Sequence, residues 1–298
     1  MARRFNRKPL TDEQRDARRK ADRDRIEQAA RALLTTDGWQ RWIRVRASNG
    51  LSRYSLGNQL ILAIEAYRRG ITPTYVAGFR AWLQLNRVPR KGEGIRILAP
   101  VTVKDRDEHG EKKVFFRTVA VFDVSMTDPL PGKQPVALSP PAEPITGDNR
   151  HHLIAPLIAH AEQLGYTVEI RELPEHGPGG WCDPKRREIV VANGPANQQV
   201  RTLTHELAHA HGVGYERYGR EQAEVLVDCV TYCVLGSVGL DVGGESIPYI
   251  AGWGEDGALD AIREYAETID TIARRIEDAL DPTPDPAADA VEPEALAA

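Results

Sequence analysis

The sequence predicts an α+β protein of two domains, and three observations lead to this prediction. Stretches with helical periodicity and stretches with strand-like alternation occur in both halves of the 298 residues, a length that suffices for two ordinary domains. A proline-rich stretch at 127–148 separates the halves. The halves also differ in charge: residues 1–125 hold 27 Lys and Arg against 14 Asp and Glu, whereas the remainder holds 12 against 29.

These observations give the expected domain organisation. Prolines favour extended, semi-rigid chain, so the proline-rich stretch is interpreted as a linker. We expect an N-terminal α+β domain at 11–126, a linker at 127–148, a C-terminal domain at 149–280, and disordered ends at 1–10 and 281–298. A basic half joined to an acidic half indicates a module for binding a polyanion attached to something else.

The first half contains two predicted helices and a predicted hairpin. Thr11 to Gln14 resembles a capping box and begins a helix that runs to about Leu34, where Asp37-Gly38 ends it. A second helix is expected over Ser55 to Arg69. Two stretches rich in β-branched and aromatic residues, 95–103 and 114–124, are expected to pair as strands.

The second half alternates short strands with helices. We expect strands at 166–172 and 188–192, a loop with a tryptophan at 177–183, and helices at 150–164, 198–212, 220–235 and 258–280. In metallopeptidases an edge strand beside the site pairs with an extended substrate, and Glu188 to Ala192 or its neighbour is a candidate. The alternative is a purely structural hairpin.

One of these helices carries the motif His205-Glu206-Leu207-Ala208-His209. Two histidines four residues apart lie on one helix face, so both imidazoles can point at one ion, and the adjacent glutamate is held near that ion. This is the H-E-x-x-H arrangement of zinc peptidases, and it predicts a zincin-like metallopeptidase domain with Glu206 as general base. The expected ion is Zn²⁺, with Mn²⁺ as the alternative.

A third protein ligand is expected from the helix that follows. This helix contains Glu224 and, one turn later, Asp228. We predict Glu224 as the metal ligand and Asp228 as the group that accepts a hydrogen bond from a ligand histidine. Glu221 and Glu216 are the rivals, and ordinary helix-surface charge is the alternative for each. Tyr215, His211 and Tyr232 are candidate oxyanion donors that the sequence does not rank.

The N-terminal domain has aromatic residues interleaved with basic ones. Proteins bind single strands in this way, because cations follow the phosphates and rings stack on bases. The expected DNA-binding residues are Arg53, Tyr54, Asn58, Arg80, Trp82, Arg90, Lys91 and Arg96. The alternative is that most of the aromatic residues belong to the core.

Four segments of the first half carry a family resemblance: S-R-Y-S-L-G-N-Q-L-I-L-A at 52–63, T-Y-V-A-G-F-R-A-W at 74–82, R-K-G-E-G-I-R-I-L-A-P-V at 90–101 and V-F-D-V-S-M-T-D at 121–128. They resemble the N-terminal domain of ArdC-type antirestriction proteins of mobile elements. The second half, with Y-I-A-G-W at 249–253, is similar to their metallopeptidase-like domain, which is related to the ImmA/IrrE peptidases. The resemblance implies a single-stranded DNA-binding domain, a gluzincin-like domain and protection of incoming DNA from restriction.

The sequence departs from the family pattern at the third-ligand helix. The family usually has E-V-E-A-E-S-V-A-Y, whereas this chain has E-V-L-V-D-C-V-T-Y at 224–232. The resemblance aligns the first acid with Glu224 and the last with Asp228, and it puts Leu226, which cannot bind metal, at the middle acid. This favours Glu224.

The expected partners are single-stranded DNA and a protein substrate. One alternative is a protein that shields DNA, with the metal domain as a non-proteolytic scaffold. Another is a regulatory protease of the ImmA/IrrE kind, although no helix-turn-helix is evident. With three cysteines, no C-x-x-C, no secretory signal and no apolar run of about 20 residues, we expect a cytoplasmic protein without membrane contact.

Overall fold

The structure, a computed structural model, describes residues 11–48, 51–104, 112–138, 143–174, 176–243, 245, 247–248 and 258–280. The expected disordered ends, 1–10 and 281–298, lie outside these residues. The described chain is a mixture of helices and strands, which confirms the predicted α+β class. None of its described helices combines the length and apolar character that crossing a bilayer requires.

The chain divides into two compact units. Among the described residues, the first comprises those within 11–30 and 60–136, and the second comprises those within 31–59 and 137–280. Residues 31–59 therefore pack with the C-terminal half, although the sequence placed them in a domain at 11–126. The assignment of DNA binding to 11–126 and of the peptidase-like domain to 149–280 stays a prediction.

The first unit contains most of helix α1 (Asp12–Arg31) and of helix α3 (Leu56–Arg68). The predicted capping box is present at the start of α1, since the Gln14 amide donates to Thr11 Oγ1 at 3.3 Å and the Thr11 amide donates to Gln14 Oε1 at 3.1 Å. Both helices lie within a few residues of their predicted ranges. The long polar stretch of α1 is thus helical from its first capped turn.

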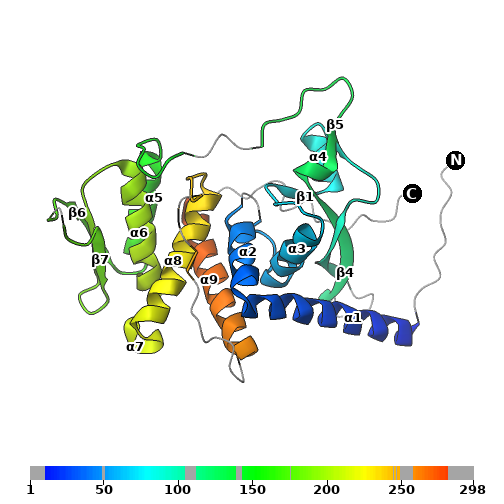
Figure 1. The fold of residues 1–298 in the computed structure, drawn as a ribbon, viewed down its shortest axis with the longest axis horizontal. Helices are drawn as coiled ribbons and strands as arrows, with labels where there is room; N and C mark the ends of the chain where they lie inside the picture. The colour runs from blue at the N-terminus through cyan, green and yellow to red at the C-terminus, as the bar shows by residue number, and fades with distance from the viewer. Residues whose placement is uncertain are drawn as a thin grey trace. The chain divides into compact units, whose positions relative to one another are not determined.

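The sheet of the first unit is built on the predicted hairpin (Figure 1). Strands β3 (Ile95–Lys104) and β4 (Lys112–Asp123) pair antiparallel, with Ile95 opposite Val121, and the short β1 (Val76–Gly78) pairs with the other edge of β4. A second antiparallel pair joins β2 (Arg87–Pro89) to β5 (Thr127–Pro129). The expectation that the linker starts at residue 127 is therefore wrong by a few residues, because Thr127 to Pro129 are bonded to β2.

The core of the first unit lies on one face of the hairpin. Ile95, Ile97 and Val121 are buried there. Trp82, on the short helix α4 (Phe79–Gln84), is fully buried, and its indole N–H donates to the Phe122 carbonyl at 2.9 Å. This hydrogen bond satisfies the one polar group of the ring, so Trp82 fixes α4 against β4.

The second unit is a three-stranded sheet on a stack of helices. Strand β8 (Glu188–Ala192) lies between β6 (Thr167–Arg171), with which it is parallel, and β7 (Gly180–Asp183), with which it is antiparallel. The predicted loop at 177–183 is thus partly an edge strand, and Glu188 to Ala192 is the central strand. The sheet packs on α5 (Ile154–Gln163) and α6 (Ala196–Ala210).

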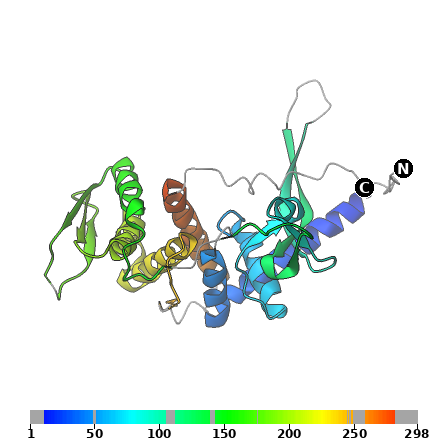
Figure 2. The same cartoon turned by 90° about the horizontal axis from the view of Figure 1, so that it is seen from above.

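The remaining helices of the second unit lie on the other side of α6. Figures 1 and 2 show α8 (Arg220–Ser237) beside α6, followed by α9 (Ala258–Leu280) and α2 (Thr36–Ala47). The short helix α7 (Tyr215–Tyr218) connects α6 to α8. Single 3₁₀ turns lie at Ala32–Leu34, Val124–Met126 and His151–Leu153.

Helix α2 belongs to the second unit because of its packing and its ion pairs. Arg46 is fully buried, and its guanidinium bonds Asp270 at 2.6 Å and both carboxylate oxygens of Glu277 at 2.9 Å, all on α9. Helix α2 also packs closely against α8, because a Cβ added to Gly236 of α8 would lie 2.7 Å from the Ala47 carbonyl oxygen of α2. Helix α2 is therefore part of the framework that holds α8 and α9.

Candidate functional site

The helix that carries the H-E-x-x-H motif is anchored by its apolar face. Val200, Leu203, Leu207 and Ala208 of α6 are fully buried. The spacing of these four residues leaves His205 and His209 together on another face of the helix, directed toward α8. Helix α6 ends before Gly212, whose φ of 99° is strained for residues other than glycine.

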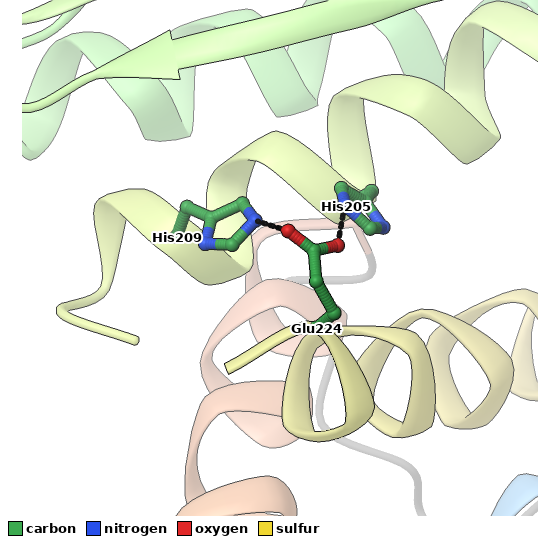
Figure 3. A group of neighbouring side chains, drawn as sticks. All are labelled: His205, His209 and Glu224. Carbon is green, nitrogen blue, oxygen red and sulfur yellow. Dashed lines mark ion pairs between the residues drawn. The ribbon is translucent and has the colours of Figure 1, made fainter. Parts of the chain in front are cut away.

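Three potential ligand atoms converge between α6 and α8 (Figure 3). His205 Nε2 lies 3.5 Å from one carboxylate oxygen of Glu224, and His209 Nε2 lies 3.7 Å from the other. One ligand atom from each of the three residues lies within 4.8 Å of the other two, and the described residues contain no other such group of His, Cys, Asp or Glu. The geometry thus brings together the three residues predicted as ligands.

Both histidine rings are oriented by a second contact. His209 Nδ1 lies 2.7 Å from the Val213 carbonyl oxygen, and His205 Nδ1 lies 3.3 Å from Asp228 Oδ1. A carbonyl or carboxylate oxygen accepts, so Nδ1 carries a proton in each ring and Nε2 is the nitrogen that faces Glu224. The structure therefore places Asp228 where the sequence predicted a partner of a ligand histidine.

The environment shifts the pKa values of these groups in different directions. Burial alone would lower the pKa of His205, but the hydrogen bond with Asp228 and the neighbouring carboxylates raise it overall. Burial lowers the pKa of His209. Burial raises the pKa of Glu206 to about 7, with Glu224 adding to the shift while His205 and the Cys182 backbone oppose it. A carboxyl group with such a value suits proton transfer near neutral pH.

The three residues and Glu206 line a cavity of about 500 Å³. Strand β7 forms one wall of this cavity through Gly180, Trp181 and Cys182. A Cβ added to Gly180 would lie 2.6 Å from both the Thr202 methyl group on α6 and the Val190 carbonyl oxygen, so only glycine permits this approach of β7 to α6. The edge strand beside the cavity is β7, the neighbour of the strand named first in the prediction.

The structure ranks the three candidate oxyanion donors. Tyr215 lines the cavity, its hydroxyl donates to Glu224, and its ring lies 5.5 Å from that of His209. The hydrogen bond to Glu224 raises the pKa of Tyr215 to about 12. His211 instead lies with its Nε2 2.9 Å from that of His160, and Tyr232 does not line the cavity. Tyr215 is therefore the candidate closest to the ligands.

The rival acids lie outside this group. Glu216 and Glu221 are exposed on α7 and α8, and neither lines the cavity. Leu226, at the position of the family's middle acid, is fully buried. Cys229 and Cys233 are also buried.

Several of the expected DNA-binding residues are placed where they cannot reach a strand. Trp82, Tyr54 and Asn58 are buried, so their prediction as DNA contacts is wrong. Tyr54 and Asn58 also belong to the second unit, together with Arg53, whose guanidinium lies 5.6 Å from the centre of the Tyr54 ring. Proximity to basic residues in the sequence does not decide which aromatic rings face solvent.

The basic residues of the first unit are better placed for DNA. Arg80, Lys91 and Arg96 are exposed. Arg90 is engaged by Glu93 at 2.8 Å and Asp128 at 2.9 Å, so its charge is partly neutralised. Phe116 on β4, which the sequence did not single out, is 69% exposed. The alternation of buried and exposed positions along the predicted hairpin is the signal that points to it.

The fold and the site define an α+β protein that combines a candidate metal centre of the H-E-x-x-H type with a separate N-terminal unit. Residues 23–122 match the family described as the N-terminal domain of anti-restriction factor ArdC. The chain thus carries an ArdC-type N-terminal domain, which confirms the resemblance seen in its sequence.

Two solved structures of the antirestriction ArdC protein from the R388 plasmid are similar to this chain. The metal-free structure is 19% identical, with a TM-score of 0.47, and the match covers 86% of this chain and 95% of that one. The Mn(II)-bound structure is 20% identical, with a TM-score of 0.41, and the match covers 76% of this chain and 82% of that one. No curated protein matches the sequence significantly.

Proposed function

We propose that this protein binds single-stranded DNA and protects incoming DNA from restriction, and that its second unit is a metal-dependent, peptidase-like centre. The observation that carries the proposal is the convergence of two imidazole nitrogens and a carboxylate beside the buried acid Glu206. The match of residues 23–122 to the ArdC N-terminal domain supports the antirestriction and DNA-binding part.

The three converging residues fit a divalent ion. His205, His209 and Glu224 would supply two nitrogen donors and one oxygen donor, the ligand set of many catalytic zinc sites, and Mn²⁺ also accepts these donors. Both Nε2 atoms face the Glu224 carboxylate, and each supplies a lone pair to an ion when that nitrogen is deprotonated. A bound ion would polarise the scissile carbonyl and stabilise negative charge on it.

The chain's own groups supply the proton transfer. Glu206, a buried carboxyl group beside the proposed ligands, takes a proton from the attacking water and later delivers it to the leaving amine. The Tyr215 hydroxyl, which donates to Glu224 in this structure, turns to the oxyanion as charge develops there.

We propose that an extended substrate binds along the open edge of strand β7. The Ala192 amide donates to the Gly179 carbonyl at 2.8 Å, so residue 179 faces β8. Alternation along an antiparallel strand then leaves the backbone groups of Gly180 and Cys182 at the open edge beside the cavity. A peptide that adds a strand to this edge would pass the proposed ligands, and the substrate class is an extended segment of a protein.

The decisive experiment is Glu206→Gln in the full chain, with protection of single-stranded DNA from an endonuclease and metal content measured together. We expect metal binding to persist and protection to fall, because the variant keeps the ligands but loses the base. Glu216→Gln, an exposed acid outside the cavity, is the matched control. Full protection by a metal-loaded Glu206→Gln protein would show that DNA shielding protects and that the centre is a scaffold.

A further inference from the structure

The hairpin of the first unit has one buried face and one open face. Directly paired residues on antiparallel strands share a face. Arg96 is opposite Ala120, Leu98 is opposite Thr118, and Pro100 is opposite Phe116. We call these six residues the outer hairpin face; four of them are exposed and the other two are half-buried. The intervening residues Ile95, Ile97 and Ala99 are buried on the core side.

Phe116 is the most unusual member of this face. Its side chain is 69% exposed, the largest exposed fraction of the large hydrophobic residues in the described part of the chain. Its position opposite Pro100 makes the end of the face apolar. A phenylalanine that remains in water contributes little to folding, and contiguous exposed apolar groups, here Phe116 with the exposed Pro100, mark a candidate binding surface.

The charge around Phe116 has a single sign. Residues 95–100 and 116–121 contain two arginines and no acid. Both Arg96 and Arg117 are exposed, and no carboxylate in the described part of the chain forms an ion pair with either. Arg90, by contrast, is held by Glu93 and Asp128. Arg96, on the outer hairpin face, and Arg117, which pairs with Ala99 on the opposite face, are therefore available to a polyanion.

We propose that the outer hairpin face binds single-stranded DNA, with the Phe116 ring stacking on a base and Arg96 contacting a phosphate. From Arg96 to Pro100 the strand extends about 13 Å, so one face presents both contacts along an extended strand. A duplex keeps the faces of its bases stacked, whereas a single strand offers them to a ring. The proposal rests on the proposed DNA-binding function and names the surface that performs it.

The test uses the full chain and a fluorescein-labelled oligothymidylate of about 16 nucleotides, with fluorescence anisotropy as the readout. We expect Phe116→Ala to weaken binding about tenfold and Phe116→Tyr to retain affinity within about twofold, because the second variant keeps a ring. Arg96→Gln should reduce the slope of log K against log salt by about 0.7, the loss of one phosphate contact.

Tyr67→Ala is the matched control, because Tyr67 is 63% exposed but lies on α3 rather than on the hairpin. It should bind like the unchanged protein, and thermal melting of each variant checks folding. If the unchanged chain binds the oligonucleotide while Phe116→Ala and Arg96→Gln bind equally well, the outer hairpin face is not the DNA surface, although DNA binding stands. If the unchanged chain does not bind, both proposals are overturned.

Discussion

The candidate metal centre and the outer hairpin face present their functional groups in opposite ways. In the metal centre each histidine ring has a second contact through Nδ1. His209 contacts the Val213 carbonyl oxygen, and His205 contacts the Asp228 carboxylate. On the hairpin, Phe116 and Arg96 project from strands into solvent. The first arrangement suits a small ion held at one point, because such an ion requires rigid ligands. The second suits the proposed DNA strand, because exposed side chains are free to adjust to a flexible polymer.

This difference teaches where substitutions should be costly. Removing a side chain of the metal centre leaves its hydrogen-bond or ion-pair partners unpaired in a partly buried environment. Removing an exposed side chain of the hairpin would cost only one contact with the proposed DNA strand. Four predictions in the packed second unit test the contrast. Two concern affinity for a metal ion, one concerns the free energy of unfolding, and one concerns the pH dependence of stability.

The largest effect is expected for His209→Ala. One of three proposed ligands is lost, so we expect affinity for Zn²⁺ or Mn²⁺ to fall about a thousandfold or more, above the effect of changing an outer partner. Isothermal titration calorimetry measures the change. His152→Ala, an exposed histidine outside the group, should have no effect. DNA affinity should also stay constant, and a parallel loss would contradict the separation of the two regions.

Arg46→Met should destabilise the second unit by about 3 kcal/mol, because the half-buried Glu277 loses its counter-charge and the buried Asp270 keeps only Arg274. Urea unfolding followed by circular dichroism gives the free energy of unfolding. Arg44→Met, an exposed position on the same helix, should change this free energy by about 0.5 kcal/mol or less. Equal stability of the two variants would mean that the Arg46 ion pairs are not formed.

Asp228→Asn should weaken metal binding by about 10- to 100-fold, less than loss of a ligand. The amide keeps the shape of the side chain but lacks the charge that orients His205 through Nδ1. Competition with a chromogenic chelator measures the affinity. Asp241→Asn, on an acid outside the proposed group, is the comparison, and unchanged affinity in Asp228→Asn would remove Asp228 from the site.

The smallest effect concerns pH and His160, whose pKa burial lowers below the usual 6.5. As the pH falls below 6.5, the unfolded chain takes up a proton at this residue that the folded chain resists. The stability contributed by the neutral ring is therefore present above pH 6.5 and lost as acidification approaches the folded-state pKa. Urea midpoints between pH 7 and pH 5 should fall less for His160→Gln than for the unchanged protein; identical pH dependence would contradict this.

The metal-centre residues were predictable because one helix fixes their spacing. His205 and His209 face the same point wherever α6 packs, whereas the choice of Glu224 over Glu221 and Glu216 rested on the resemblance to the family pattern. Tyr215 could not be ranked, and β7 could not be recognised as the edge strand, since both depend on how distant segments pack. Trp82 and Tyr54 were expected to contact DNA because basic residues lie near them in the sequence. Both are buried, since basic neighbours in the sequence do not determine whether a ring is exposed.

Helix α2 was missed for a local reason. The sequence suggested that Asp37-Gly38 ends a helix, but Gly38 lies in the first turn of α2, where its amide donates to Thr35 Oγ1 at 3.1 Å. A Cβ on Gly38 would lie 1.9 Å from the Ala32 carbonyl oxygen. Glycine at position 38 allows the first turn of α2 to pack closely against the backbone of Ala32. This contact depends on the path of residues 32–37, which the sequence pattern does not show.

Because α2 packs with the second unit, truncating the chain at the proline-rich stretch would remove part of that unit. A fragment that starts after the proline-rich stretch would lack residues 31–59 and would uncover the side of α8 that Ala47 touches, with two carboxylates of α9 left without Arg46. Laboratory truncations and natural exchanges at that junction should therefore yield insoluble products. A transplantable version of the metal-binding half has to take this early helix with it.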